Sequence, residues 1–431
     1  MNVAFYTLGC KANQFETQAL EKMFTEKGHC VVPFASKADA YIINTCTVTA
    51  SGDKKSRNAA YRARALNPDC ILVVCGCYAQ VKPEEVRSMC SPDVICGTGD
   101  KSRIIELTEK AAAERIPLCT VKDTLYRDGF DFMPAGSLKG RTRALLKVQD
   151  GCQNFCSYCL IPYARGLSRS LPLDIVISEA QRLSKEGYLE IVITGIEISS
   201  YGFDLPDKPG VDQMISAVCS AAPSSRIRLG SLEPRTVTEE FCRTLSRYPN
   251  LCPHFHLSLQ SGCDRTLKAM NRKYDTKRYL LSCQLLREYF PGCAITTDLI
   301  VGFPGETEED FANTLDFIRK CGFSQMHIFP YSSRPGTAAA SMEGQLTHAE
   351  KQRRAARAQK VADSMKSDYL QNLIGNIEPV LFEQKKNGLF SGHTTRYCLV
   401  KAPGEGLSGK IANVRIESSD GECLLGSIIP V

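Results

Sequence analysis

The sequence lacks the features of membrane and exported proteins. Its 431 residues contain no apolar run long enough to span a membrane. The first residues, Met1 to Tyr6, show no basic stretch followed by an apolar one, so no secretory signal is visible. The 21 cysteines are odd in number and come without an export signal, which argues against a disulfide framework. We therefore expect a cytoplasmic protein with no membrane partner, in which most cysteines are small buried hydrophobes.

The N-terminal third alternates between short apolar runs and helical periods. Expected strands at Val3–Leu8, Ala40–Thr45 and Ile71–Val74 are separated by helical stretches, which predicts a parallel sheet with helices on its faces. Three cysteines follow the ends of these strands, namely Cys10, Cys46 and Cys77. Ligands bind at this edge of an open parallel sheet, so the three thiols are expected to converge there. Cys75 is a rival for Cys77, because it lies two residues earlier and can face the same side of the strand.

The remaining chain divides into a linker and two further parts. Residues 116–140 lose periodicity and predict a linker. Six strand–helix units then predict a full or partial parallel barrel, with strands expected at Leu145–Val148, Glu190–Thr194, Arg226–Gly230, His254–Leu259, Ala294–Val301 and Met326–Pro330. After a long charged helix, short alternating runs from residue 377 predict a small antiparallel β module of roughly 55 residues. We set the domain boundaries at 1–115, 141–370 and 371–431, with 116–140 as the linker.

Three more cysteines stand close together after the first expected barrel strand. Cys152, Cys156 and Cys159 lie in a loop beside Gly151, where burial gives no reason for three thiols. A zinc site needs a fourth Cys or His nearby, and none occurs before Cys219. Three thiolates at this spacing suit three corners of a 4Fe–4S cluster whose fourth iron is free to bind something else.

The string Lys147-Val-Gln-Asp-Gly-Cys-Gln-Asn-Phe-Cys-Ser-Tyr-Cys-Leu-Ile-Pro-Tyr-Ala-Arg-Gly166 resembles the methylthiotransferases of the radical S-adenosylmethionine superfamily. The resemblance runs over nearly the whole chain. It implies an N-terminal domain with a three-cysteine auxiliary 4Fe–4S cluster, a (β/α)6 partial TIM-type radical barrel with a second 4Fe–4S cluster, and a C-terminal TRAM β-barrel. Cys152, Cys156 and Cys159 would hold the cluster that binds S-adenosylmethionine. Cys10, Cys46 and Cys77 would hold the auxiliary one.

The context of the first cysteine, Leu8-Gly-Cys-Lys-Ala-Asn-Gln-Phe-Glu-Thr17, is similar to the branch that acts on N6-threonylcarbamoyladenosine at position 37 of tRNA. The isopentenyladenosine branch tends to have Gly-Cys-Gln-Met-Asn, and the ribosomal-protein branch Gly-Cys-Pro-Lys-Asn. The resemblance thus implies addition of a methylthio group to carbon 2 of the modified adenine. It implies no catalytic residue beyond the clusters, because an unactivated C–H bond calls for cofactor chemistry.

The same resemblance implies contacts to S-adenosylmethionine at the ends of the barrel strands. We expect Gly195 and Glu197 near its amino group, although relatives often carry His or Asn where this chain has Glu197. Glu233, Ser258 and Gln260 are suited to its ribose hydroxyls. Gly302 follows the fifth strand, where a glycine allows close backbone approach to the adenine.

The expected partners are the anticodon loop of tRNA and an electron donor such as flavodoxin or ferredoxin. A net charge of +6 permits a nucleic-acid partner without requiring one. Two basic stretches are candidates for RNA contact, one with Lys54, Lys55, Arg57, Arg62 and Arg64, the other with Lys385, Lys386, Phe390, His393, Arg396 and Tyr397. Two alternatives stay open: the same chemistry on isopentenylated tRNA or a ribosomal protein, and an RNA-binding protein whose metal sites are only structural.

Overall fold

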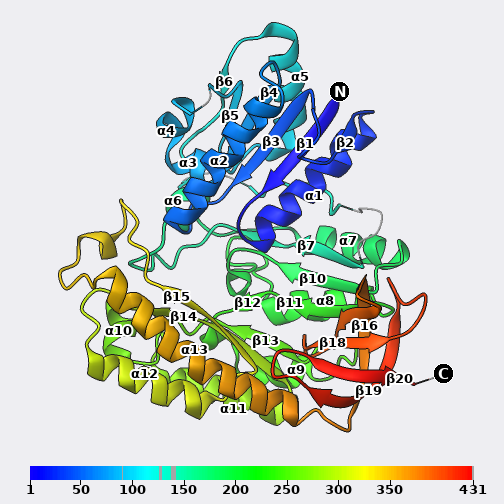
Figure 1. Cartoon of the computed structure of the whole chain (residues 1–431), viewed down its shortest axis with the longest axis vertical. Helices are drawn as coiled ribbons and strands as arrows, with labels where there is room; N and C mark the ends of the chain where they lie inside the picture. The colour runs from blue at the N-terminus through cyan, green and yellow to red at the C-terminus, as the bar shows by residue number, and fades with distance from the viewer. Residues whose placement is uncertain (90, 126–128, 137–141, 430–431) are drawn as a thin grey trace.

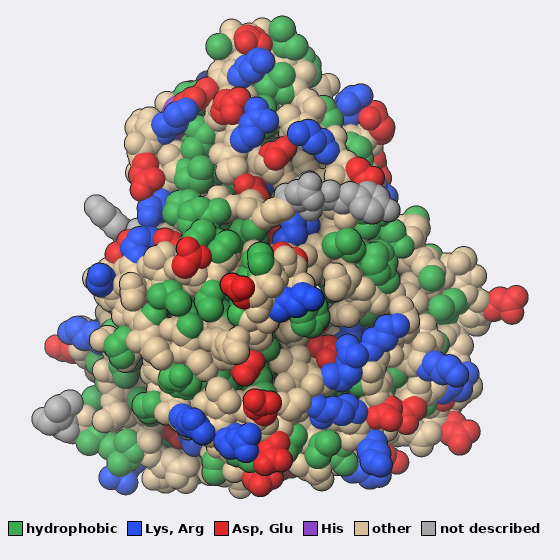
Figure 2. Space-filling model, turned by 180° about the vertical axis from the view of Figure 1, so that it is seen from behind, with side chains coloured by type: hydrophobic (Ala, Val, Ile, Leu, Met, Phe, Trp, Pro, Cys, Tyr) green, Lys and Arg blue, Asp and Glu red, His purple; other side chains and the backbone are tan. Residues whose placement is uncertain are grey.

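The chain folds into three parts that follow one another along the sequence, a sheet with helices, a partial barrel and a small closed barrel (Figure 1). The computed structural model describes residues 1–89, 91–125, 129–136 and 142–429. On the face seen in Figure 2, Lys and Arg side chains are interspersed with Asp and Glu. That face therefore does not have a single continuous positive patch. Within the described residues, no helix combines the length and apolarity needed to cross a membrane.

The N-terminal part is a six-stranded parallel sheet between two helical layers, with strand order β2-β1-β3-β4-β5-β6. Its strands are β1 (Asn2–Thr7), β2 (Cys30–Val32), β3 (Ala40–Thr45), β4 (Ile71–Gly76), β5 (Val94–Cys96) and β6 (Leu118–Cys119). Its helices are α1 (Lys11–Glu26), α2 (Ala50–Leu66), α3 (Cys77–Val81), α4 (Pro83–Arg87), the 3-10 turn η1 (Lys101–Arg103) and α5 (Ile104–Glu114). Alternate residues of each strand face opposite layers: Ile42 and Val73 pack with α1 and α5, whereas Ile43 and Val74 pack with α2.

Strand β6 lies inside the stretch 116–140 that the sequence predicted as a linker. It pairs in parallel with β5, with Leu118 opposite Val94. Two residues are too few to leave a periodic signal, which is why the pattern missed this strand. Of the predicted linker, residues 126–128 and 137–140 lie outside the described residues.

The central part contains the six parallel strands expected from the sequence, with ends shifted by at most two residues. Its strands are β7 (Arg143–Lys147), β10 (Glu190–Thr194), β11 (Arg226–Leu229) with its continuation β12 (Ser231–Leu232), β13 (His254–Leu257), β14 (Ala294–Val301) and β15 (Gln325–Pro330). They form a three-stranded sheet, β11-β10-β7, and a four-stranded one, β12-β13-β14-β15. The two meet where β11 gives way to β12, and together they make the expected partial barrel.

The long helices of the central part are α7 (Leu173–Lys185), α8 (Val211–Ala221), α11 (Thr276–Tyr289), α12 (Glu308–Cys321) and α13 (His348–Gln371). The shorter elements are β8 (Gln149–Asp150), α6 (Ile161–Arg165), β9 (Arg169–Ser170), η2 (Ile198–Ser200), η3 (Pro234–Thr236), α9 (Glu239–Leu245), α10 (Asp264–Ala269) and η4 (Ala338–Ser341). The long helices, with the shorter α9 between α8 and α11, cover the outside of the barrel, and other short elements connect its strands. Helix α13 runs beside β15 and leads to the C-terminal part (Figure 1).

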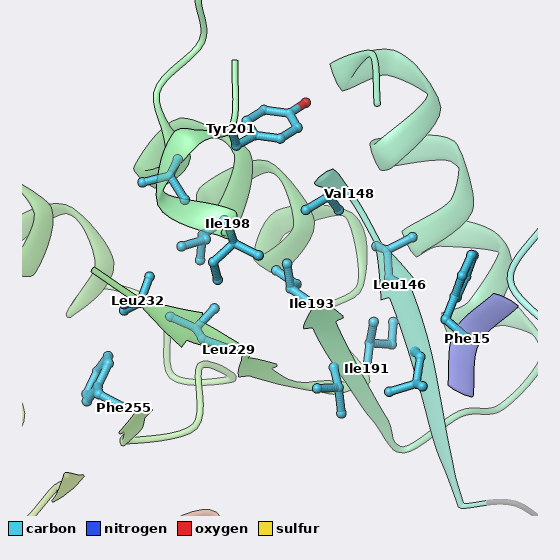
Figure 3. Packing of buried hydrophobic residues seen from close by; sticks show 14 of the residues in the cluster. Phe15, Leu146, Val148, Ile191, Ile193, Ile198, Tyr201, Leu229, Leu232 and Phe255 are labelled. Atoms are coloured by element: carbon cyan, nitrogen blue, oxygen red, sulfur yellow. The ribbon is translucent and has the colours of Figure 1, made fainter. Parts of the chain in front are cut away.

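One hydrophobic core joins the first two parts. Phe15 of α1 lies beside Leu146 of β7, and Ile191 and Leu229 continue the core into the barrel (Figure 3). Because helix α1 packs on both the N-terminal sheet and the first barrel strand, the two parts are held against each other by apolar burial.

The C-terminal part is the small closed barrel expected from the alternating runs. Its strands are β16 (Ile377–Lys386), β17 (Leu389–His393), β18 (Leu399–Pro403), β19 (Ile411–Ser419) and β20 (Leu424–Ile428). The order around the barrel is β16-β17-β18-β20-β19. Four pairings are antiparallel, and the pairing of β18 with β20 is parallel because β19 lies between them in the chain.

Candidate active site: two groups of three cysteines

The first group of cysteines lies at one edge of the N-terminal sheet. Cys10 is the N-cap of α1, Cys46 follows β3, and Cys77 begins α3 directly after β4. Since β1, β3 and β4 are neighbours, the three residues reach the same edge. Burial, together with the nearby thiols of Cys77 and Cys10, raises the pKa of the Cys46 thiol to about 11. The topology therefore brings the three predicted thiols within electrostatic reach of one another.

Cys75, the rival of Cys77, lies in the core instead. Its side chain is fully buried and packs with Val73 and Cys96 in the hydrophobic cluster under α1 and α5. Burial raises the pKa of its thiol to about 12. This position favours Cys77 as the third ligand, and the ligand assignment itself stays a prediction.

Glycines shape the chain before two of these cysteines. Gly9 has φ +97°, and a Cβ there would lie 2.9 Å from Sγ of Cys46. Gly76 has φ +96°, and its Cβ would lie 2.6 Å from Oδ1 of Asn44. Positive φ and close packing both require glycine at these two positions. The glycines allow the backbone to turn sharply just before Cys10 and Cys77.

The second group occupies the loop after β8. Gly151 precedes Cys152 with φ +75°, and a Cβ there would lie 2.0 Å from the carbonyl oxygen of Leu167. Burial, with a smaller contribution from the neighbouring thiol of Cys156, raises the pKa of the Cys152 and Cys159 thiols to about 12. The loop thus holds its three thiols close together, as the spacing predicted.

Arg272 is a functional candidate that the sequence analysis missed. It follows α10, and its Nη1 donates a hydrogen bond to Sγ of Cys156 at 3.1 Å. Its guanidinium also lies over the ring of Tyr274, 4.8 Å from the centroid. The guanidinium therefore places a positive charge directly beside one of the three predicted ligands. Only folding brings Arg272 to the loop, since 116 residues separate the two partners.

Both cysteine groups fit an iron–sulfur cluster. Within the part of the chain that the structure describes, no three His, Cys, Asp or Glu side chains gather around one point as ligands of a single ion do. A cubane cluster attaches each cysteine to a different iron, so its ligands do not have to meet at one point. A thiolate-bound cubane is negatively charged, and each group has a cation near it: Arg272 beside Cys156, and Arg165 beside Cys77.

A buried network of charged side chains connects the two groups. Arg165 of α6 donates from Nη1 to Oε1 of Glu16 at 2.8 Å and to Oδ1 of Asp150 at 2.9 Å, and from Nη2 to Oδ1 of Asn13 at 2.6 Å. Asn13 in turn donates to the carbonyl oxygens of Leu8 and Thr45, each within two residues of a cysteine of the first group. Asp150 stands two residues before Cys152. The network therefore fixes both cysteine loops relative to Arg165.

Glu16 is the central anion of this network. Lys147 donates to its Oε1 at 2.8 Å, and Lys101 pairs with its Oε2. Burial by itself would raise the pKa of the Glu16 carboxyl, but Arg165, Lys101 and Lys147 hold it well below its usual range. The carboxylate therefore stays charged inside the molecule.

The loop after β10 contains the predicted contacts Gly195 and Glu197. Oε1 of Gln149 accepts hydrogen bonds from the backbone N–H of Ile196 at 3.0 Å and of Glu197 at 2.8 Å. Nε2 of Gln149 donates to the carbonyl oxygen of Gly151 at 2.8 Å. Burial raises the pKa of the Glu197 carboxyl to about 7. Gln149, which the sequence analysis did not single out, thus ties the Glu197 loop to the cysteine loop.

The other predicted contacts lie at the same end of the barrel. Glu233 is buried, and its carboxylate accepts from the backbone N–H of Arg235 at 3.0 Å. Oγ of Ser258 and Oγ of Ser231 are 2.8 Å apart. Gln260 has φ +67°, and its backbone bonds with Asp298 and Ile300 of β14. These residues end successive strands, and their contacts with a cofactor stay predictions.

At Gly302 the close neighbour is a side chain of the protein. Its φ is +71°, and a Cβ there would lie 2.5 Å from Cγ of Lys351 in α13. The packing of α13 therefore accounts for this glycine, and the adenine contact expected there is an additional role that stays a prediction.

Some cations of the basic stretch on α2 are exposed, and others are paired with carboxylates. Lys54, Lys55 and Arg62 are exposed. Arg57 donates to Oε1 of Glu85 at 3.1 Å, and Arg64 pairs with Asp93 at 2.9 Å. Two of the five cations are thus occupied within the domain.

The basic stretch of the C-terminal barrel is used largely for packing. Tyr397 stacks on His393 and on His254 of β13, with ring centroids 4.7 and 5.2 Å away. Arg396 pairs with Glu378, and Phe390 is buried in the barrel core. Lys385 and Lys386 remain exposed. Tyr397 therefore contributes to the junction with the central barrel and Phe390 to the core of the C-terminal one, and RNA contact by this stretch stays a prediction.

A partial parallel barrel with three cysteines in its first loop defines a radical S-adenosylmethionine enzyme. Residues 146–318 match the Radical SAM superfamily, and residues 2–97 match the Uncharacterized protein family UPF0004. The solved structure of TsrM from Kitasatospora setae, a radical S-adenosylmethionine methyltransferase with cobalamin and a [4Fe-4S] cluster bound, has the same fold. It superposes with a TM-score of 0.56 at 16% identity, covering 90% of this chain and 80% of that one.

Relatives whose names state an activity match almost the whole chain. The threonylcarbamoyladenosine tRNA methylthiotransferase MtaB of Bacillus subtilis is 39% identical, covering 96% of this chain and 93% of the relative. MtaB of Aquifex aeolicus is 37% identical, covering 96% and 100%. The tRNA-2-methylthio-N(6)-dimethylallyladenosine synthase of Symbiobacterium thermophilum is 33% identical, covering 98% and 93%. The chain belongs to the radical S-adenosylmethionine methylthiotransferase family.

Proposed function

We propose that this chain adds a methylthio group to carbon 2 of N6-threonylcarbamoyladenosine at position 37 of tRNA. The observation that carries the proposal is the pair of three-cysteine groups joined through Arg165. One group starts radical chemistry in this family. The second, on a separate domain, is free to serve another step, and the MtaB relatives match both domains over nearly their full length.

We assign S-adenosylmethionine and one 4Fe–4S cluster to Cys152, Cys156 and Cys159, and a second 4Fe–4S cluster to Cys10, Cys46 and Cys77. When bound, these groups supply a radical that breaks the C–H bond at carbon 2 and the sulfur that replaces the hydrogen, chemistry that side chains alone do not perform.

The side chains of the protein bind the cofactor and orient the cysteine loops. Glu197 offers a carboxylate to an amino group, and Gln149 holds its loop against the cysteine loop. Arg272 places a hydrogen-bonding cation against Sγ of Cys156. Arg165 and Glu16 hold the two cysteine loops in one arrangement. Fixed geometry matters because a radical reacts with whatever hydrogen lies closest, so the target carbon must be positioned accurately.

The remaining assignments complete the proposal. We place the domains at 1–115, 141–370 and 371–431, the reaction in the cytoplasm, and a flavodoxin or ferredoxin as electron donor. Within the two basic stretches, the exposed residues Lys54, Lys55, Arg62, Lys385 and Lys386 are the cations that we assign to contacts with the tRNA backbone.

Nucleoside analysis of tRNA from a deletion strain tests the function. Loss of 2-methylthio-N6-threonylcarbamoyladenosine, restored by the wild-type gene and not by Cys156→Ala, is the expected result. Loss of the methylthio-isopentenyl nucleoside instead would assign the chain to the other tRNA branch. A colourless zinc protein from anaerobic purification, without cleavage of S-adenosylmethionine, would favour the purely structural metal sites.

A further inference from the structure

A polar cleft lies where the three parts of the chain meet. It has a volume of about 390 Å³ and is lined by α1, by residues of the barrel strands β7, β10 and β11, and by the C-terminal barrel. Its charged residues are the cations Lys11, Arg143 and Arg228 and the anions Glu190 and Glu383.

Both anions of the cleft are already paired. Oε1 of Glu190 accepts from Nε of Arg228 at 2.9 Å and lies 3.0 Å from Nε of Arg143. Glu383 accepts from Nη2 of Arg143 at 3.0 Å and lies 3.0 Å from Nδ1 of His393. The arginines therefore neutralise the carboxylates and are committed to holding the C-terminal barrel on the central one.

Lys11 is the cation of the cleft that remains available. It is exposed at the start of α1, close enough to Arg143, Arg228 and Glu190 for electrostatic interaction. Within the described residues, its ammonium group interacts with Arg228, Arg143 and Glu190 through their charges alone, without a hydrogen bond or an ion pair. Two amides of the same helix, Gln14 and Gln18, line the cleft beside it. Two other cations near this lysine make the local electrostatic potential more positive, which favours binding of an anion.

The backbone of Lys11 is held at the candidate auxiliary site. It directly follows Cys10. Asn13 anchors this first turn by donating to the carbonyl oxygens of Leu8 at 2.7 Å and Thr45 at 2.9 Å. The cleft therefore begins one residue from a thiol that we assign to the sulfur-donating cluster.

The substrate of the proposed function has an anion in the right neighbourhood. A threonylcarbamoyl group on N6 carries the free carboxylate and hydroxyl of threonine, whereas a dimethylallyl group is hydrocarbon only. Carbon 2 and N6 belong to the same adenine ring, so the N6 substituent must lie within several ångströms of the atom that receives sulfur. A cation close to the auxiliary cysteines is therefore placed to meet that carboxylate.

We propose that Lys11 binds the carboxylate of the threonylcarbamoyl group, and so selects this substrate over adenosines with uncharged N6 substituents. The inference rests on the proposed function and names the residue that reads its substrate. An ammonium–carboxylate hydrogen bond is among the stronger polar contacts and is lost when either charge is removed. Gln14 and Gln18 supply amides for the hydroxyl and the carbamoyl group.

The test removes the charge of Lys11 in the protein and, separately, the charge of the carboxylate in the RNA. Full-length holoprotein is prepared anaerobically as wild type, Lys11→Gln, Lys11→Arg and the control Lys22→Gln, which removes a charge from the same helix outside the cleft. Each is titrated with one anticodon stem-loop bearing N6-threonylcarbamoyladenosine, its carboxyl methyl ester, or N6-isopentenyladenosine. Binding is measured by fluorescence anisotropy, with methylthiolation rates alongside.

We expect wild type to bind the carboxylate RNA about tenfold more tightly than the ester, which corresponds to one charged hydrogen bond. Lys11→Gln should lose this difference and bind the ester as wild type does. Lys11→Arg should keep most of the difference, and Lys22→Gln all of it. Iron content and RNA-independent cleavage of S-adenosylmethionine should be unchanged in every variant.

Two outcomes would overturn the inference. If Lys11→Gln weakens all three RNAs equally, Lys11 contacts a backbone phosphate; if it weakens none, Lys11 binds no part of the substrate. In both cases wild-type methylthiolation of the threonylcarbamoyl RNA would leave the proposed function standing. If wild type modifies only the isopentenyl RNA, the proposed function itself fails.

Discussion

Arg165 and Glu16, 149 positions apart in sequence, form a fully buried ion pair between the barrel and the N-terminal domain, with Nη1 2.8 Å from Oε1. The pair matters because Arg165 also contacts residues that hold the cysteine loops. Arg165 bonds to Asp150 before Cys152, and its contact with Asn13 reaches the loops of Cys10 and Cys46. A second buried arginine, Arg334, makes a similar link by donating to Thr47 at 2.8 Å and Asp53 at 2.6 Å.

Glu16→Gln should destabilise the protein strongly. It leaves Arg165, Lys101 and Lys147 buried around one fewer anion, and breaking such a network typically costs about 3–5 kcal/mol. A lower thermal unfolding midpoint and reduced iron content are expected, measured by calorimetry and iron assay. Glu26→Gln, at the exposed end of the same helix, should cost less than about 1 kcal/mol. Equal effects of the two substitutions would show that the network does not hold the domains together.

Cys156→Ala and Cys77→Ala should separate the two cysteine groups. Cys156→Ala should abolish cleavage of S-adenosylmethionine. Cys77→Ala should keep cleavage but stop methylthiolation, and lower iron by about four atoms per chain, since each cubane has its own ligands. Cys75→Ala is the control and should keep both activities; if it behaves as Cys77→Ala is expected to, our ligand assignment is wrong. Iron assays and product analysis measure these outcomes.

Gly9→Ala should damage the auxiliary site selectively. The new methyl group would have to occupy space next to Sγ of Cys46, 2.9 Å away. Gly28→Ala is matched to it, with φ +85° and no atom within 4 Å of the Cβ, so it carries only the cost of the backbone conformation, about 1 kcal/mol. Gly9→Ala should lose methylthiolation and auxiliary iron, whereas Gly28→Ala should lose neither. Mössbauer quantification of the clusters distinguishes them.

Arg272→Gln should make the central cluster harder to reduce. Removing a cation that is hydrogen-bonded to Sγ of Cys156 at 3.1 Å disfavours the added electron. We expect a more negative reduction potential in an EPR-monitored titration and slower cleavage of S-adenosylmethionine. Lys273→Gln removes a neighbouring exposed charge and should leave the potential unchanged. An unchanged potential in Arg272→Gln would show that its bond to Cys156 has no electronic role.

Glu190 should make the junction with the C-terminal barrel sensitive to acid. Burial would raise the pKa of its carboxyl, but Arg228, Arg226 and Arg143 lower it from 4.5 to about 2. A depressed folded-state pKa stabilises the protein fully above pH 4.5, and this contribution is lost as the pH falls toward 2. The stability difference between wild type and Glu190→Gln should therefore shrink below pH 4.5. Thermal midpoints across pH measure it, with exposed Glu405→Gln as the control; a constant difference would contradict the prediction.

The sequence alone determined the features that depend on local pattern. Strand–helix alternation predicted the parallel sheet and the barrel, because a buried parallel strand is a short apolar run in any context. The spacing of Cys152, Cys156 and Cys159 predicted a cluster site, since three thiols in one loop are already neighbours. The same pattern predicted that Cys10, Cys46 and Cys77 lie together, because a parallel sheet places all its strand ends at one edge. The two-residue strand β6 was missed, since it is too short to show a period.

Only the tertiary structure decided which side chains meet and which remain available. Nothing in the local sequence pairs Arg165 with Glu16 or Arg272 with Cys156, because each contact joins distant segments. The sequence predicted RNA contact for the stretch around Tyr397, and only the structure shows that this ring also packs against His254 at a domain junction. Lys11 stands out for the opposite reason. Its charge is visible in the sequence, but only the fold shows that the carboxylates beside it are paired with arginines, so that it is left for a ligand.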